Sequence, residues 1–156
     1  MALPACGSES SAAPETSTAT TIESRGEKKV ESPPPRETKA RSSACAGHLN
    51  GFLDQLEHLR RNLAIGVSYE QYVAELGTVR RSYEAVPVAD LDLACLSGAA
   101  ASAESAFDGY LAAANTWGDC VSDAGCETAA LEPELQHLWR LAANQLAAAR
   151  QALEVG

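Results

Sequence analysis

The fold of this chain is decided by residues 93–117, LACLSGAAASAESAFDGYLAAANTW. Apolar and small side chains recur in this stretch three and four positions apart, at Leu93, Leu96, Ala100, Ala103, Phe107, Tyr110, Ala114 and Trp117. This spacing matches the 3.6-residue period of an amphipathic α-helix. Similar patterns predict three further helices, over residues 46–65, over residues 69–86, and from about Thr128 or Pro133 onward.

Four amphipathic helices joined by short connections favour one architecture. No segment of the sequence shows the two-residue period of a strand. The expected fold class is therefore all-α, an antiparallel up-down-up-down four-helix bundle that follows a disordered N-terminal tail. The bundle is assigned to residues 45–156, and residues 1–44 form a separate region.

The N-terminal region has the composition of a tether. Residues 7–44 contain few apolar side chains other than alanine and are rich in Ser, Thr, Glu, Lys and Pro, including the run 33–35. Such a stretch cannot bury enough apolar area to offset its conformational entropy, so we expect it to be disordered. It follows a lipobox-like start, Leu3-Pro4-Ala5-Cys6-Gly7, in which Cys6 is the candidate lipid acceptor. The alternative is a free cysteine without a lipid, because no basic and apolar leader precedes Cys6.

The remaining four cysteines, Cys45, Cys95, Cys120 and Cys126, predict two disulfides. Cys95 and Cys120 lie at opposite ends of the third helix, about 37 Å apart at 1.5 Å per residue, and Cys126 lies beyond the same end as Cys120. A disulfide needs Cα atoms within about 7 Å, which excludes Cys95 from pairing with either of them. The expected pairs are Cys45–Cys95 and Cys120–Cys126. Disulfides persist outside the cytosol, so an extracytoplasmic location is expected.

Charge restricts the partners. Residues 45–156 contain fifteen Asp and Glu, six Arg and no Lys, which gives this part of the chain the full net charge of −9. An acidic domain repels phosphate backbones and anionic headgroups, so we expect no nucleic-acid binding and membrane contact only through a lipid anchor. No segment has the roughly 20 apolar residues of a transmembrane helix.

Few residues suggest chemistry. Glu134 and His137 form a Glu-x-x-His pattern, which occurs in di-metal helical bundles, but those sites need a second such motif and two more carboxylates. These two residues are therefore weak metal-ligand candidates. No nucleophile and base can be paired from the sequence, and no phosphate-binding glycine loop is present. We expect neither catalysis nor a cofactor.

Aromatic residues are the better candidates for binding. Trp139 lies beside the core position Leu138, and Tyr69 and Tyr72 add aromatic surface to the second helix. An exposed patch of Trp and Tyr is typical of a partner-binding site. The competing interpretation is that these side chains belong to the core and its boundary.

The tract from Leu91 to Trp117, the turn Trp-Gly-Asp-Cys at 117–120 with its Cys-x5-Cys spacing, and the segment 133–139, PELQHLW, resemble a group of uncharacterised exported proteins and lipoproteins of actinobacteria. The resemblance covers residues 45–155 and implies an envelope location without implying an activity. The sequence thus favours a non-enzymatic lipoprotein or secreted protein whose acidic bundle binds a protein or small ligand. The alternative is a ligand- or metal-storing bundle with an interior site.

Overall fold

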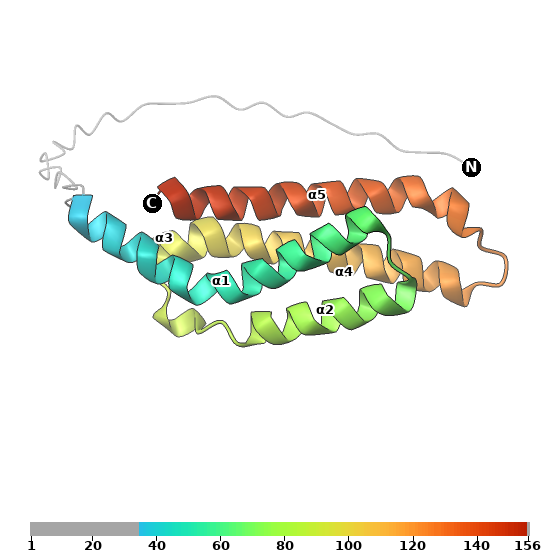
Figure 1. The fold of residues 1–156 in the computed structure, drawn as a ribbon, viewed down its shortest axis with the longest axis horizontal. Coiled ribbons are helices and arrows are strands. Elements are labelled where there is room, and N and C mark those ends of the chain that lie inside the picture. Colours follow the sequence, from blue (N-terminus) through green and yellow to red (C-terminus); the bar gives the residue numbers. More distant parts are fainter. Residues whose placement is uncertain (1–34, 156) are drawn as a thin grey trace, which may run out of the picture. The chain divides into compact units, whose positions relative to one another are not determined.

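The structure, a computed structural model, describes residues 35–155, with side chains from Ser43 onward. All regular structure in this range is helical, and the long helices run side by side with antiparallel neighbours (Figure 1). The predicted all-α four-helix bundle is therefore confirmed. Its elements are α1 (Pro35–Ile65), α2 (Tyr69–Glu84), the 3₁₀ turn η1 (Val88–Asp90), α3 (Leu93–Cys95), the π-helical segment η2 (Leu96–Ala100), α4 (Ala101–Ser122) and α5 (Thr128–Val155).

The first helix begins earlier than the sequence predicts. It starts at Pro35, ten residues before the expected boundary at Cys45. Proline is well placed in the first turn of a helix, and residues 36–44 contain no further proline or glycine to stop one. Extending an existing helix costs much less than nucleating a new one, so the first helix extends back through this polar stretch. Cys6 and the rest of the predicted tether, residues 7–34, lie outside the described residues.

The segments α3, η2 and α4 form one continuous helical run, which contains a shift that periodicity did not predict. Leu93, expected in the core, is 80% exposed, whereas Cys95 and Ala99 are buried. A π-helix holds more residues per turn than an α-helix, so η2 rotates the residues before it relative to those after it. After η2 four of the five predicted core positions are buried, namely Ala103, Phe107, Tyr110 and Ala114, and the fifth, Trp117, is partly exposed.

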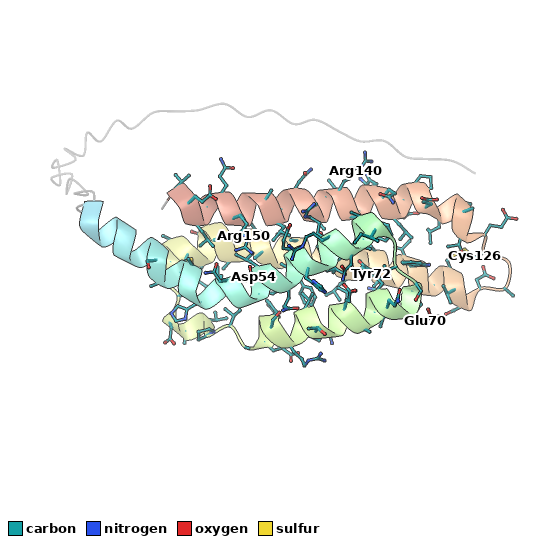
Figure 2. All side chains as sticks on the ribbon, viewed as in Figure 1. Asp54, Glu70, Tyr72, Cys126, Arg140 and Arg150 are labelled. Carbon is teal, nitrogen blue, oxygen red and sulfur yellow. A yellow bond between two sulfur atoms is a disulfide. The ribbon has the colours of Figure 1, made fainter. Side chains whose placement is uncertain are left out.

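Each of the long helices has two principal neighbours, because α1 and α4 each pack against both α2 and α5. The α4–α5 contact is the most extensive, and it is tight at Gly109, where an added Cβ would lie only 3.0 Å from the Cβ of Ala142. Arg150 of α5 forms an ion pair with Asp54 of α1 on the surface of the bundle (Figure 2). The largest fully buried side chains are Tyr72, Tyr110, Leu49, Leu53, Leu56, Leu59, Leu146 and Val79.

Two disulfides fasten the bundle at separate places. The end disulfide joins Cys45 of α1 to Cys95 of α3, with 5.7 Å between their Cα atoms. The turn disulfide joins Cys120 to Cys126 across the α4–α5 turn, where Cys126 is labelled in Figure 2, with 5.2 Å between the Cα atoms. Both pairings are those that helix length predicts. Two disulfides suggest an oxidising, extracytoplasmic location.

The connection between α1 and α2 is short and well defined. Gly66 ends α1 with a φ of 104°, a conformation that favours glycine over residues with a Cβ. A capping box then starts α2: the Gln71 backbone N–H donates to Ser68 Oγ at 3.3 Å, and the Ser68 N–H donates to Gln71 Oε1 at 2.9 Å. These contacts fix the loop at residues 66–68.

None of the described helices is long and apolar enough to cross a membrane.

Candidate functional site

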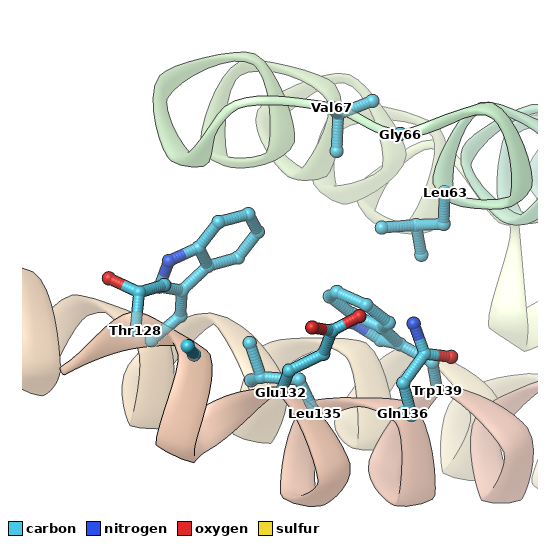
Figure 3. Close-up of a pocket in the computed structure, with 10 residues that line it drawn as sticks. Leu63, Gly66, Val67, Thr128, Glu132, Leu135, Gln136 and Trp139 are labelled. Carbon is cyan, nitrogen blue, oxygen red and sulfur yellow. The ribbon is translucent and has the colours of Figure 1, made fainter.

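A surface pocket of about 270 Å³ lies between the α1–α2 loop at residues 66–68 and the first turns of α5. Leu63 and Val67 form its α1–α2 side, and Thr128, Glu132, Gln136 and Trp139 form its α5 side (Figure 3). Figure 3 shows the Glu132 carboxylate and the Gln136 amide extending from α5 toward the α1–α2 side. We call this feature the aromatic pocket, because Trp117 of α4 and Trp139 of α5 both line it.

The helical period places the polar and aromatic groups of α5 together. Glu132, Gln136 and Trp139 are spaced four and three residues apart, so they fall within an arc of about 60° on the helix. Pro133 lies inside α5, and its ring nitrogen has no hydrogen to donate to the carbonyl of Ala129 four residues earlier. Ala129 itself is one of the residues that line the pocket.

Aromatic rings pack around the pocket as one cluster. The Trp117 and Trp139 rings are 6.0 Å apart between centroids and are inclined at 63° to each other. Tyr69 packs on Trp117 with 5.6 Å between centroids. Gly118 makes room for it, because a side chain at position 118 would collide with the Tyr69 hydroxyl. Both indoles line the pocket, and we call this inclined pair the indole corner.

Tyr72 packs against both indoles, and of the two interpretations drawn from the sequence the core position, not the exposed patch, applies to it. It is 0% exposed, and its ring lies 5.9 Å from each of the two indole centroids. The reason is that its hydroxyl has partners inside the bundle: it donates to the Tyr110 carbonyl oxygen at 2.8 Å and accepts from Trp139 Nε1 at 3.2 Å. Burial raises the pKa of the Tyr72 hydroxyl well above its ordinary value. Tyr72 therefore supports the pocket without being accessible to a partner.

The other two predicted aromatic candidates remain accessible. Trp139 and Tyr69 are both partly exposed, and both belong to the cluster at the pocket. Trp139 lines the pocket directly, whereas Tyr69 reaches it only through Trp117. The structure therefore brings the three candidates together, in different layers.

Negative charge borders the loop on both sides. Among the described residues that line the aromatic pocket, Glu132 is the only charged one. A second cleft of about 240 Å³ shares Gly66 and Val67 with it and includes Glu75. Glu75 Oε1 accepts from Asn62 Nδ2 at 2.8 Å, whereas its Oε2 is buried without a hydrogen-bond partner within residues 43–155.

The weak metal candidates of the sequence are not brought together with further ligands. Glu134 and His137 are both exposed on α5. In the part of the chain that the structure describes, no group of three or more His, Cys, Asp or Glu side chains could hold a metal ion.

Sequence reasoning identified Trp139 but missed the rest of the pocket. The signal for its α5 wall was the spacing of Glu132, Gln136 and Trp139. The opposite wall, Leu63 and Val67, gives no comparable signal, because its position depends on how the loop folds over α5. Comparisons with protein-family models, with curated proteins and with solved structures find no match to this chain.

Proposed function

We propose that this protein is a non-enzymatic binding protein of the cell envelope, and that the aromatic pocket is its binding site. The main support is the pocket itself, in which two partly exposed indoles, a carboxylate and an amide converge on one opening. Ligand sites in proteins are typically concave and apolar with a few convergent polar groups. The two disulfides support action in an oxidising compartment.

A binding role is favoured over a catalytic one by the groups in the pocket. Its lining offers one carboxylate, one amide and one hydroxyl, from Glu132, Gln136 and Thr128, and the described lining residues include no histidine, cysteine or lysine. A carboxylate without a nucleophile or a second titratable group is suited to holding a ligand rather than to transferring protons.

The proposal includes a lipid anchor at Cys6, which would hold the bundle at the outer face of the cell membrane. Its support is the lipobox-like run at residues 3–7 and the resemblance of residues 45–155 to exported actinobacterial proteins. Labelling cells with a palmitate analogue tests it, with Cys6→Ala as the variant. We expect the label to require Cys6, and equal labelling of both proteins would remove the anchor from the proposal.

A fragment screen observed by ¹H–¹⁵N NMR tests the binding site. The chain has two tryptophans, and both line the pocket, so their two indole N–H signals report on it directly. We expect binding fragments to shift these signals in the oxidised full chain. Fragments that shift other regions while leaving both indole signals unmoved would contradict the proposal.

A matched pair of variants locates the effect. Ala129 lines the pocket, whereas its neighbour Ala130 is exposed and does not. Ala129→Leu should fill part of the pocket and weaken fragment binding, and Ala130→Leu should leave binding unchanged. Both substitutions add the same side chain to the first turn of α5, so a difference between them arises from the pocket.

A further inference from the structure

We propose that the aromatic pocket selects an organic cation, with a substituted ammonium group seated between Trp117 and Trp139 and neutralised by Glu132. This inference rests on the proposed function, because it names the ligand class of the same site. Four features of the structure support it: the indole corner, the oxygen acceptors, the charge of the domain, and the size of the pocket.

The indole corner provides the π surface that such a cation requires. A cation within about 6 Å of a ring centroid is attracted by the ring quadrupole, and tryptophan is the strongest of the aromatic side chains in this respect. The two centroids are 6.0 Å apart and the planes are inclined at 63°, so one group in the corner can contact both rings. The Nε1 hydrogen of Trp139 is donated to Tyr72, so this positive edge is not offered to the ligand.

The α5 side of the pocket offers side-chain oxygen acceptors to a cation. Glu132 contributes a carboxylate, and Gln136 contributes an amide oxygen on the same face of α5. A carboxylate on an open pocket attracts a cation and opposes an anion.

Helix dipoles do not reverse this preference. The start of α5 and the start of α2 bring their positive ends to this part of the bundle, and the ends of α1 and α4 bring negative ones. These contributions oppose one another, so the Glu132 carboxylate determines the local charge. The field of the whole domain adds to it, because residues 45–156 have a net charge of −9 and no lysine.

The volume of the pocket agrees with a small organic group. About 270 Å³ corresponds to roughly nine water molecules at about 30 Å³ each, which is enough for a trimethylammonium group with a short substituent. A bare metal ion would need several ligands around it, and Glu132 is the single charged side chain among the described lining residues. The indoles instead favour a cation that carries apolar carbon around its charge.

The experiment compares choline with 3,3-dimethylbutan-1-ol, in which carbon replaces the charged nitrogen at nearly the same shape. Tryptophan fluorescence of the oxidised full chain measures both, because both tryptophans of the chain lie in the pocket. We expect choline to give a saturable change and the neutral alcohol to bind between about 2-fold and 30-fold more weakly. The affinity for choline should fall as NaCl is added, while that for the alcohol should not.

Two substitutions that each remove one negative charge distinguish the effect of the pocket carboxylate from the effect of the domain's overall charge. Glu132→Gln removes the proposed counter-ion, and Glu134→Gln removes an exposed carboxylate two residues away that does not line the pocket. We expect Glu132→Gln to weaken choline binding several-fold without changing binding of the alcohol. Glu134→Gln should change neither.

Three results would overturn the inference: equal affinity for choline and the alcohol, equal effects of the two glutamate substitutions, or no saturable response to choline. In each case the fragment screen decides the proposed function separately. Neutral fragments that shift the indole signals would keep the pocket as a binding site while removing the cation. A screen in which no fragment shifts them would overturn both.

Discussion

Replacing each of the two most buried tyrosines by phenylalanine should have different effects on stability. Tyr72 and Tyr110 are both 0% exposed, yet their hydroxyls differ in their partners. The Tyr72 hydroxyl makes hydrogen bonds of 2.8 and 3.2 Å, to the Tyr110 carbonyl oxygen and from Trp139 Nε1. The Tyr110 hydroxyl is buried without a hydrogen-bond partner within residues 43–155.

The magnitudes follow from this difference. Each hydrogen bond contributes about 0.5–1.5 kcal/mol net, and a donor left without an acceptor costs a further penalty of about 1–3 kcal/mol when it is buried. Trp139 is partly exposed, so water can accept a hydrogen bond from its indole N–H, and the penalty for losing the Tyr72 acceptor stays small. Tyr72→Phe should therefore destabilise the protein by about 2 kcal/mol. Tyr110→Phe removes a hydroxyl whose desolvation is uncompensated, so it should be neutral or stabilising by up to about 1 kcal/mol.

Urea unfolding at pH 7, followed by circular dichroism at 222 nm with both disulfides intact, measures the two free energies of unfolding. The denaturant slope should stay constant, because neither substitution changes how much surface unfolding exposes. Tyr72→Phe should also move the Trp139 indole N–H signal, which provides a second observation of the lost contact. Equal destabilisation by the two substitutions, or a loss of more than about 1 kcal/mol in Tyr110→Phe, would refute the reasoning.

Three further predictions concern disulfides, packing and pH. Replacing the cysteines of the end disulfide should lower the free energy of unfolding by about 4 kcal/mol by chain entropy, for a sequence separation of 50, and replacing those of the turn disulfide by about 2 kcal/mol, for a separation of 6. Only the second replacement should alter the tryptophan emission. Urea unfolding measures the two free energies, and fluorescence measures the emission. Gly109→Ala should destabilise by about 1 kcal/mol, because overpacking against Ala142 exceeds the gain in helix propensity, whereas Gly51→Ala, with no atom within 4 Å of the added Cβ, should stabilise by about 0.5–1 kcal/mol in the same assay. Burial raises the pKa of Tyr72 and of Tyr110 above 10.0, to about 12 for Tyr110, so the folded state holds both protons more tightly. Stability that is complete below pH 10 should fall by up to about 2.8 kcal/mol per pH unit, about 1.4 for each tyrosine, as the pH rises toward 12, which a series of urea midpoints would show.

Helix positions and disulfide pairing could be predicted because both depend on local geometry. A 3.6-residue period identifies a helix without knowledge of its neighbours, and a rise of about 1.5 Å per residue then places Cys95 far from Cys120. The end disulfide follows by elimination. Helix starts are less predictable, and Pro35 shows why: the polar residues that follow it have no apolar stripe, yet nothing in them stops a helix.

The π-helical segment and the hydrogen bonds of Tyr72 depend on tertiary contacts instead. The residues of η2 are alanine, glycine, serine and leucine, and they fit an α-helical stripe as well as a shifted one. The choice is made by which residues face the neighbouring helices, and Ala99 rather than Ala100 faces the core. Likewise, tyrosine is a common residue in binding sites, and only the positions of Tyr110 and Trp139 determine that the Tyr72 hydroxyl makes its hydrogen bonds within the bundle.

The two disulfides have different consequences for the pocket because of where they lie. The end disulfide is attached to α1 at Cys45, 18 residues and so about 27 Å along the helix from Leu63 in the pocket wall. Its main effect is on the unfolded chain. The turn disulfide begins three residues after Trp117 and ends two residues before Thr128, so it links the two helices that bring both indoles to the pocket. Reducing it frees the start of α5 to move relative to α4, and the geometry of the indole corner depends on the relative position of these two helices. The short loop therefore contributes less to stability than the long one, yet it controls the geometry of the proposed site more directly.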